Sequence, residues 1–84
     1  MNYEKDQILC NQGDKIEHMY IIVSGLVSIT CTMDNFPVVI EYLTAGSSLH
    51  GEAFLQGDKM DVVAKCESKV TVYALKVDAF YLLS

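Results

Sequence analysis

The residues best suited to chemistry in this chain lie in the segment Leu49–Leu55, which reads Leu-His-Gly-Glu-Ala-Phe-Leu. Gly51 is followed directly by the carboxylate of Glu52, and the pair closes a run of strand-like segments. Glycine permits tight turns of the backbone, and the unpaired amides at the start of a short helix attract anions. The segment therefore predicts a turn that binds a phosphate group, in a pocket for a ligand such as a sugar phosphate.

The same region lacks the cation that usually accompanies such a turn. Arginine is well matched to phosphate because its planar guanidinium forms two parallel hydrogen bonds. All six basic residues of the chain are lysines, and downstream of the Gly-Glu pair the sequence reads Lys59-Met60-Asp61-Val62. Met60 cannot bind an anion, and Asp61 would repel one. Lys59 is the candidate for a compensating point charge, and Lys65 is a less favoured one.

Length and charge limit the classes of function. The 84 residues, with a net charge of −5, form one predicted domain over residues 1–84. An acidic chain without clustered Lys and Arg predicts no nucleic-acid surface. The longest apolar run, Met19–Val23, is far below the roughly 18 residues that span a bilayer, so we expect no membrane insertion of this segment. The polar N-terminus is unlike a signal peptide.

Enzymatic alternatives find little support in the residue types. A cupin-like metal site would need converging histidines, but only His18 and His50 exist and they are far apart in sequence. The three cysteines, Cys10, Cys31 and Cys66, are widely spaced and predict small buried side chains in a reducing compartment, without disulfides or zinc. No nucleophile has a recognisable context. We therefore expect no enzyme activity, no metal and no cofactor.

The elements that would position the phosphate turn are mostly strands. β-branched runs separated by turn residues predict strands at 7–10, 19–23, 26–31, 38–43, 62–66 and 70–75, with a loop over 33–37. Residues 51–56 predict one helical turn, and residues 77–83 predict the start of a C-terminal helix capped by Asp78. The fold class is therefore mainly β: a double-stranded β-helix or jelly-roll-like β-roll, with a short helix at the phosphate turn and the start of a C-terminal helix.

Taken in order, the motifs resemble the cyclic nucleotide-binding domain family. The motifs that carry the resemblance are Ile8-Leu9, Gln12-Gly13-Asp14, His18–Ile22, Ser24–Val27, Leu43–Gly46, Gly51-Glu52 with Leu55, Tyr73–Leu75 and Phe80–Leu83. Together they cover nearly the whole chain. The resemblance implies a β-roll of about eight strands flanked by helices. It also implies a phosphate-binding cassette over Leu49–Ala64.

The resemblance assigns roles within the cassette for a possible ligand, cAMP or cGMP. Backbone amides after the Gly-Glu pair would face the cyclic phosphate, and Glu52 would accept a hydrogen bond from the ribose 2′-hydroxyl. The residues implied to bind ligand are Gly51, Glu52, Ala53 and, as the substitute cation, Lys59. The residues implied to line the pocket are Leu49, His50, Met60, Asp61 and Val62. In the family an arginine pairs with the phosphate, Phe usually precedes the Gly-Glu pair where this chain has His50, and a C-terminal helix closes over the base.

The missing arginine sets the expected function. Loss of a buried charged partner costs about 2–5 kcal/mol, which weakens binding by roughly 30- to several-thousand-fold. We therefore expect a regulatory module with weak or lost cAMP and cGMP binding. We expect it on the cytosolic side of a larger membrane protein, an ion channel or sodium/proton exchanger, in contact with flanking helices. The alternative is a ligand-independent structural or protein-interaction domain with a filled pocket.

Overall fold

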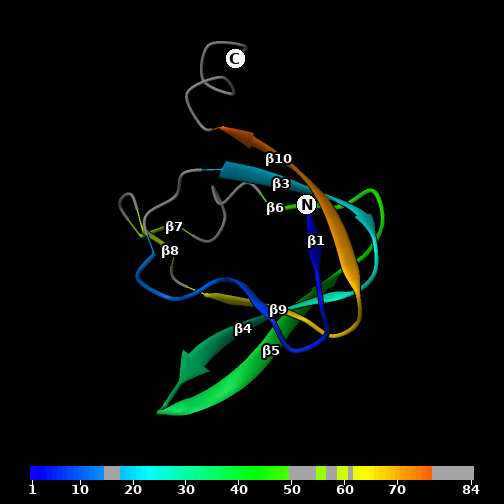
Figure 1. Cartoon of the computed structure of the whole chain (residues 1–84). Helices are drawn as coiled ribbons and strands as arrows, with labels where there is room; N and C mark the ends of the chain where they lie inside the picture. The colour runs from blue at the N-terminus through cyan, green and yellow to red at the C-terminus, as the bar shows by residue number, and fades with distance from the viewer. Residues whose placement is uncertain (15–17, 50–54, 57–58, 61, 77–84) are drawn as a thin grey trace.

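The fold is a roll of antiparallel strands (Figure 1). The computed structural model describes residues 1–14, 18–49, 55–56, 59–60 and 62–76. Ten strands in this part of the chain form two four-stranded sheets and one separate two-stranded hairpin. All pairings between neighbouring strands are antiparallel.

Each sheet combines strands that are distant in sequence. The first sheet has the order β1 (Asn2–Tyr3), β10 (Val70–Lys76), β3 (His18–Ser24) and β6 (Ser48–Leu49). The second has the order β2 (Ile8–Cys10), β9 (Val63–Cys66), β4 (Val27–Met33) and β5 (Phe36–Leu43). The hairpin consists of β7 (Leu55–Gln56) and β8 (Lys59–Met60).

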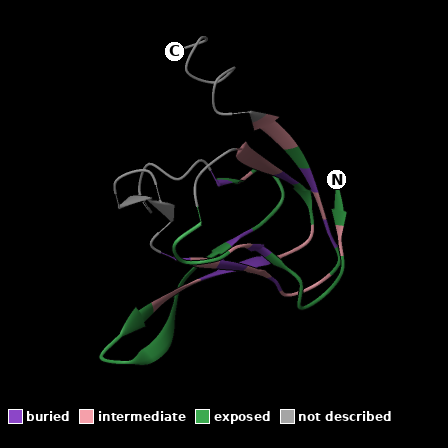
Figure 2. Ribbon diagram, turned by 60° about the vertical axis from the view of Figure 1, so that its left-hand side comes forward, coloured by how far each residue is buried: buried purple, intermediate pink, exposed green. Residues whose placement is uncertain are grey.

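A single hydrophobic core joins the two sheets. Buried side chains alternate with exposed or half-buried ones along β9 and β10, as expected for strands with one face turned inward (Figure 2). The buried hydrophobic residues are Leu9, Ile22, Val27, Ile29, Leu43, Leu49, Val62, Ala64, Cys66, Val70 and Val72. Tyr3, Cys10, Tyr20 and Cys31 pack against this cluster while remaining partly exposed. Burial of these side chains is the main force that holds one sheet against the other.

Two neighbouring turns carry the chain between the sheets. Gly25 and Leu26 connect β3 to β4, and residues 67–69 connect β9 to β10. The amide of Leu26 donates a 3.1 Å hydrogen bond to the Ser68 hydroxyl, and the amide of Glu67 donates a 2.9 Å bond to the Leu26 carbonyl. These bonds fix the two crossing points to each other and so fix the spacing of the sheets at this end.

Strands β4 and β5 form a long hairpin that projects from the body of the roll (Figures 1 and 2). Its turn is Asp34-Asn35, with φ values of 51° and 69°. A two-residue type I′ turn requires positive φ at both positions, and Asp and Asn tolerate this conformation. The expected loop over 33–37 is therefore wrong at its ends, because Met33 lies in β4 and Phe36 and Pro37 lie in β5.

The predicted mainly-β roll is confirmed, and so are all six predicted strands within a few residues. The two-residue strands β1, β6, β7 and β8 were not predicted. The expected helical turn over 51–56 is wrong at Leu55-Gln56, which lies in β7. Its remainder, and the expected helix start over 77–83, lie outside the described residues. Within the described ranges, no helix is long and apolar enough to cross a membrane.

Candidate functional site

The predicted cassette begins at a strand of the first sheet. In β6, Leu49 lies opposite Tyr20 and Ser48 lies opposite Ile21 of β3. The Leu49 side chain is 2% exposed and belongs to the core. The turn before β6 is also tied to β3, since the amide of Gly46 donates a 2.8 Å hydrogen bond to the Ile22 carbonyl. The start of the cassette is therefore held firmly in place.

Two rings lie beside this starting point. His18 and Tyr20 project from the same face of β3, with ring centroids 6.1 Å apart and planes tilted by 32°. Tyr20 packs against the core, as expected for a half-exposed sheet residue, and lies opposite Leu49. Among the described residues, no group of three His, Cys, Asp or Glu side chains could hold a metal ion. His50, the other histidine, lies outside them.

The cassette ends in the second sheet. Val62 is 4% exposed and belongs to the same core as Leu49. The next residues enter β9, where Val63 lies opposite Thr30 and Ala64 lies opposite Ile29 of β4. The cassette therefore connects the two sheets, with one buried hydrophobic residue at each end. For Leu49 and Val62, the predicted pocket-lining role stays a prediction alongside this observed role in the core.

Part of the cassette forms the β7–β8 hairpin. Leu55 lies opposite Met60, and Gln56 lies opposite Lys59. The backbone of Lys59 is part of strand β8. The other residues predicted to bind or line the pocket, His50, Gly51, Glu52, Ala53 and Asp61, lie outside the described residues. The β7–β8 pairing could not be found from periodicity, because two residues are too few to show alternation.

Lys65, the less favoured substitute cation, is engaged elsewhere. It lies on β9 opposite Ser28 and Ile8, and its ammonium group is 3.5 Å from the Asp6 carboxylate. Both side chains are substantially exposed, so this ion pair contributes little to stability. Its geometry nevertheless directs the ammonium group toward the segment between β1 and β2. The role of Lys59 as the phosphate cation stays a prediction.

The three thiols are free; Cys66 is buried in the core, as predicted, whereas Cys10 and Cys31 are half-buried and pack against it. Burial raises the pKa of Cys10 to about 11, assisted by the nearby Asp14 carboxylate, while a backbone hydrogen bond from Ala64 acts in the opposite direction. Burial also raises the pKa of Cys66. Because the thiolate is the reactive form, neither thiol is suited to nucleophilic catalysis near neutral pH.

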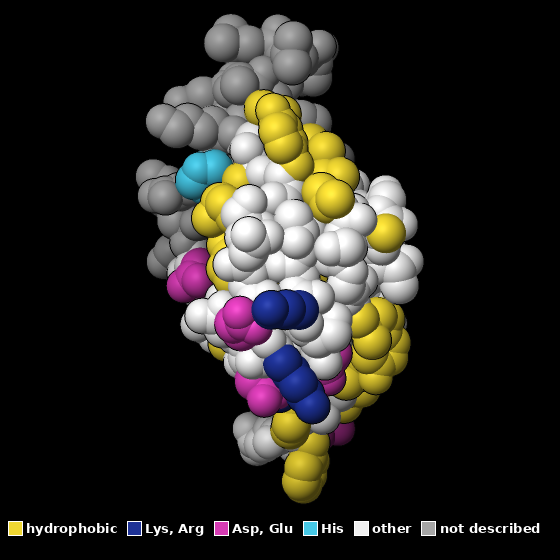
Figure 3. Space-filling model, turned by 45° about the vertical axis from the view of Figure 1, so that its right-hand side comes forward, with side chains coloured by type: hydrophobic (Ala, Val, Ile, Leu, Met, Phe, Trp, Pro, Cys, Tyr) yellow, Lys and Arg dark blue, Asp and Glu magenta, His cyan; other side chains and the backbone are white. Residues whose placement is uncertain are grey.

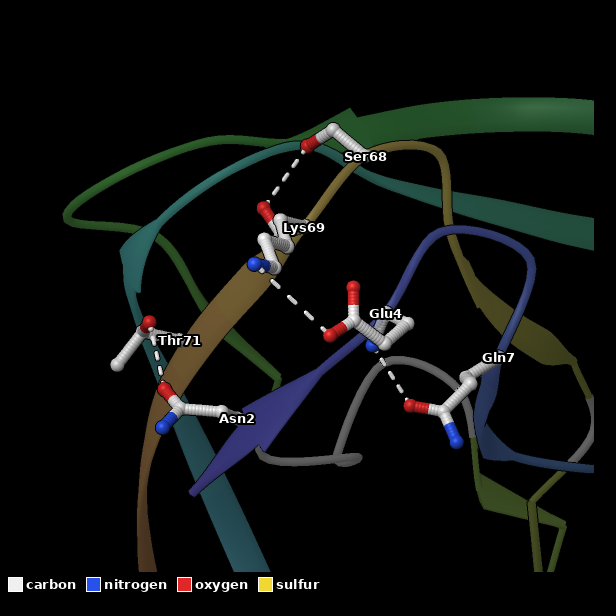
Figure 4. A network of polar contacts seen from close by, with 6 residues as sticks. All are labelled: Asn2, Glu4, Gln7, Ser68, Lys69 and Thr71. Carbon is white, nitrogen blue, oxygen red and sulfur yellow. Dashed lines mark hydrogen bonds and ion pairs between the residues drawn. The ribbon is translucent and has the colours of Figure 1, made fainter.

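A groove of about 420 Å³ is lined by residues of β1 and the start of β10. These strand segments lie away from the β7–β8 hairpin (Figure 1). The rim of the groove carries a polar network (Figure 4). The ammonium nitrogen of Lys69 lies 3.9 Å from a carboxylate oxygen of Glu4. The Thr71 hydroxyl donates a 2.9 Å hydrogen bond to the side-chain oxygen Oδ1 of Asn2. Both charged side chains are highly exposed, and their charges largely compensate each other. This groove therefore offers no clear electrostatic preference for an anion.

The two sheets and the connecting cassette define a small β-roll binding module. The sequence profile of the cyclic nucleotide-binding domain family matches residues 1–83, and the chain belongs to that family. No curated protein matches the chain by sequence. The predicted family and the predicted roll are thus confirmed.

Solved structures share the fold. The c-di-GMP-responsive global regulator CLP of Xanthomonas campestris is 20% identical, with a TM-score of 0.86 over 99% of this chain and 41% of its own. PfPKA-R in its cAMP-bound form is 28% identical, with a TM-score of 0.87 over 98% and 29%. The cAMP-bound EAL enzyme Bd1971 is 24% identical, with a TM-score of 0.79 over 90% and 21%. This chain therefore spans less than half the length of each of these three proteins.

Proposed function

We propose that this chain is the cyclic nucleotide-binding regulatory module of a larger protein and binds cAMP or cGMP weakly. The observation that supports this proposal is the attachment of the cassette, which runs from buried Leu49 in the first sheet to buried Val62 beside the second. Any rearrangement of the cassette on binding an anion would act on both sheets. A ligand regulates an attached domain only if it favours one such arrangement over another.

The proposed chemistry is recognition of a cyclic phosphate without catalysis. The backbone amides of Gly51 and Ala53 bind the phosphate oxygens, Glu52 accepts a hydrogen bond from the ribose hydroxyl, and Lys59 supplies the positive charge. A lysine holds phosphate as a point charge and lacks the paired geometry of arginine. Since Met60 and Asp61 offer no cation, we propose an affinity roughly 30- to several-thousand-fold below that of a site with arginine.

The proposed setting is the cytosolic part of a membrane ion channel or exchanger, in which flanking helices transmit the response. This part of the proposal rests on analogy with family members that lack the cassette arginine, and fold likeness alone is a weak guide to setting. The similar structures carry the same roll within proteins of different kinds. Binding of a nucleotide to the isolated roll does not depend on which setting is correct.

The test is an NMR titration of the 84-residue chain with cAMP, cGMP and, because CLP is c-di-GMP-responsive, c-di-GMP. We expect saturable amide shifts at Gly51, Glu52 and Ala53 in the presence of either cyclic mononucleotide, reduced by Lys59→Ala. If only c-di-GMP produced saturable shifts, c-di-GMP would take the place of cAMP and cGMP as the proposed ligand. No shift with any nucleotide at millimolar concentration would instead support a ligand-independent interaction domain with a filled pocket.

A gain of function provides the sharper experiment. The family's arginine would fall at Met60 when counted back from the final strands and near Asp61 when counted forward. Met60→Arg places a guanidinium at the first of these positions, and we expect it to tighten cAMP binding by at least about tenfold. Met33→Arg is the matched control, because it adds the same charge at an exposed position on the β4–β5 hairpin. Equal affinity for both variants would show that position 60 does not face the phosphate.

A further inference from the structure

In the β4–β5 hairpin, strand β5 is exposed to solvent along nearly its whole length. Strand β5 is the last strand of its sheet in the described part of the chain, and seven of its eight residues are exposed. Figure 2 shows exposed residues along β5 and at the tip of β4, where the hairpin projects beyond the buried core. Such an edge presents unpaired backbone groups that are ready to bind another strand.

The exposed side chains of the hairpin are mainly apolar. Phe36 is 70% exposed, Met33 and Tyr42 are 56% exposed, and Val39 and Ile40 are close to half exposed. In Figure 3, hydrophobic side chains are prominent at the bottom of the molecule, where the hairpin lies, while Lys and acidic side chains gather above it. Proteins usually protect exposed edges with charges, especially lysine, but β5 carries none except Glu41.

We propose that β5 is a dimer interface, in which a second copy of this chain pairs its own β5 antiparallel to the first. The β2-β9-β4-β5 sheet of one copy would then continue into the same sheet of the second copy, across the two-fold axis of the dimer. In such an isologous contact, the backbone groups of each β5 edge pair with those of the same edge in the partner. The assembly therefore ends at two copies. Pro37 lacks an N–H group, so the paired segment runs from Val38 to Tyr42.

Backbone hydrogen bonds between the two edges would hold such a dimer together, because the side chains of a strand project above and below the sheet. Apolar neighbours on the two faces would add cross-strand contacts, since Val39, Ile40 and Tyr42 are 47–56% exposed. An interface of this kind is small. We therefore expect a dimer that dissociates at micromolar concentrations.

Charge also favours this contact over others between two acidic molecules. The chain carries a net charge of −5, but the hairpin contributes only Asp34 at the turn and Glu41 in the strand. Like charges directly opposite each other destabilise a strand pair. The two-fold register of this segment is centred on Ile40, so Val38 lies opposite Tyr42 and Glu41 lies opposite Val39 of the second copy. In this register the two Glu41 carboxylates avoid each other.

Sedimentation velocity of the 84-residue chain between about 1 μM and 1 mM tests the proposal, because small interfaces dissociate in this range. We expect a monomer–dimer equilibrium that Val39→Lys weakens at least about tenfold. Val23→Lys is the matched control, since Val23 is 56% exposed on β3 and lies outside the interface. It should dimerise like the parent chain.

Three results would overturn the proposal: a monomer throughout, assembly beyond the dimer, or equal dimerisation of both lysine variants. Circular dichroism establishes whether Val39→Lys folds. If it does not, Tyr42→Lys takes its place, because Tyr42 is also exposed on β5. Slower amide exchange over residues 38–42 at high protein concentration would support strand pairing directly.

Discussion

The backbone of Gly25 lies so close to the carbonyl oxygen of Lys69 that no side chain fits between them. A Cβ atom built on Gly25 would meet this oxygen and the Cα atom of Val70. Gly25 also has a φ of +99°, a conformation that L residues adopt only with strain. The two turns that connect the sheets can therefore approach each other only because one of them contains glycine.

We first predict that Gly25→Ala strongly destabilises the fold. An L residue at positive φ costs about 1–3 kcal/mol, and overpacking against backbone adds about 1–3 kcal/mol. Gly13→Ala is the matched control, since Gly13 has a φ of +90° but a Cβ atom added there would have no neighbour within 4 Å. Both variants share the cost of an L residue at positive φ, so their free energies of unfolding in urea should differ only by the steric clash at Gly25. Equal losses would mean that the two turns are not in close contact.

The Ser68 hydroxyl also stabilises the contact between the two turns. It accepts a 3.1 Å hydrogen bond from the Leu26 amide and donates a 3.0 Å bond to the Lys69 carbonyl. We predict that Ser68→Ala lowers the free energy of unfolding by about 1 kcal/mol, because a part-buried amide loses its partner. Ser47→Ala, which removes an exposed 3.3 Å bond from Thr44, should cost clearly less. The reverse order in urea denaturation would contradict this role of Ser68.

A third prediction concerns the core. Val72 is 2% exposed on β10, whereas Val23 is 56% exposed on β3. Val72→Ala should lower the free energy of unfolding by about 2 kcal/mol, because it removes buried methyl groups and leaves a cavity. Val23→Ala should change it by less than about 0.5 kcal/mol. Thermal and urea denaturation measure both, and similar values would show that the two sheets do not enclose Val72.

The fourth prediction uses the raised pKa of Cys10, about 11. Alkylation by iodoacetamide, followed residue by residue with mass spectrometry, should remain slow at pH 8 and accelerate up to about pH 11. Asp14→Asn should lower the pKa of Cys10, because the carboxylate disfavours the thiolate, and should speed alkylation at a given pH. Asp34→Asn, at the distant hairpin turn, should have no effect. An unchanged rate of Cys10 alkylation in Asp14→Asn would show that Asp14 does not raise the pKa of Cys10.

The same shift links stability to pH. The folded-state pKa of Cys10 lies above the value of about 8.5 for an unfolded thiol. Its contribution to stability is therefore complete below about pH 8.5 and is lost as the pH rises toward 11. We expect the pH dependence of the melting temperature above about pH 8.5 to weaken in Cys10→Ala. Identical profiles for the two proteins would contradict this linkage.

The sequence by itself determined the strand class, the family and the absence of arginine from the chain. Runs such as Met19–Val23 and the alternation after Gly25 are local signals, because side chains on a strand alternate between its faces. The absence of arginine is likewise a property of composition, because all six basic residues are lysines. Turn residues marked most boundaries, although the Asp34-Asn35 turn proved shorter than the loop expected there.

Only the tertiary structure decided which strands pair, which residues are buried and which strand stays bare. The two-residue strands β1 and β6 exist because distant partners, β10 and β3, satisfy their hydrogen bonds, and no local pattern specifies this. Val62 became a core residue because β9 places the end of the cassette against the second sheet. The apolar run Val38–Ile40 would suit a buried strand, yet it is exposed because β5 lies at the end of its sheet. Burial depends on contacts between remote segments, which a one-dimensional pattern does not contain.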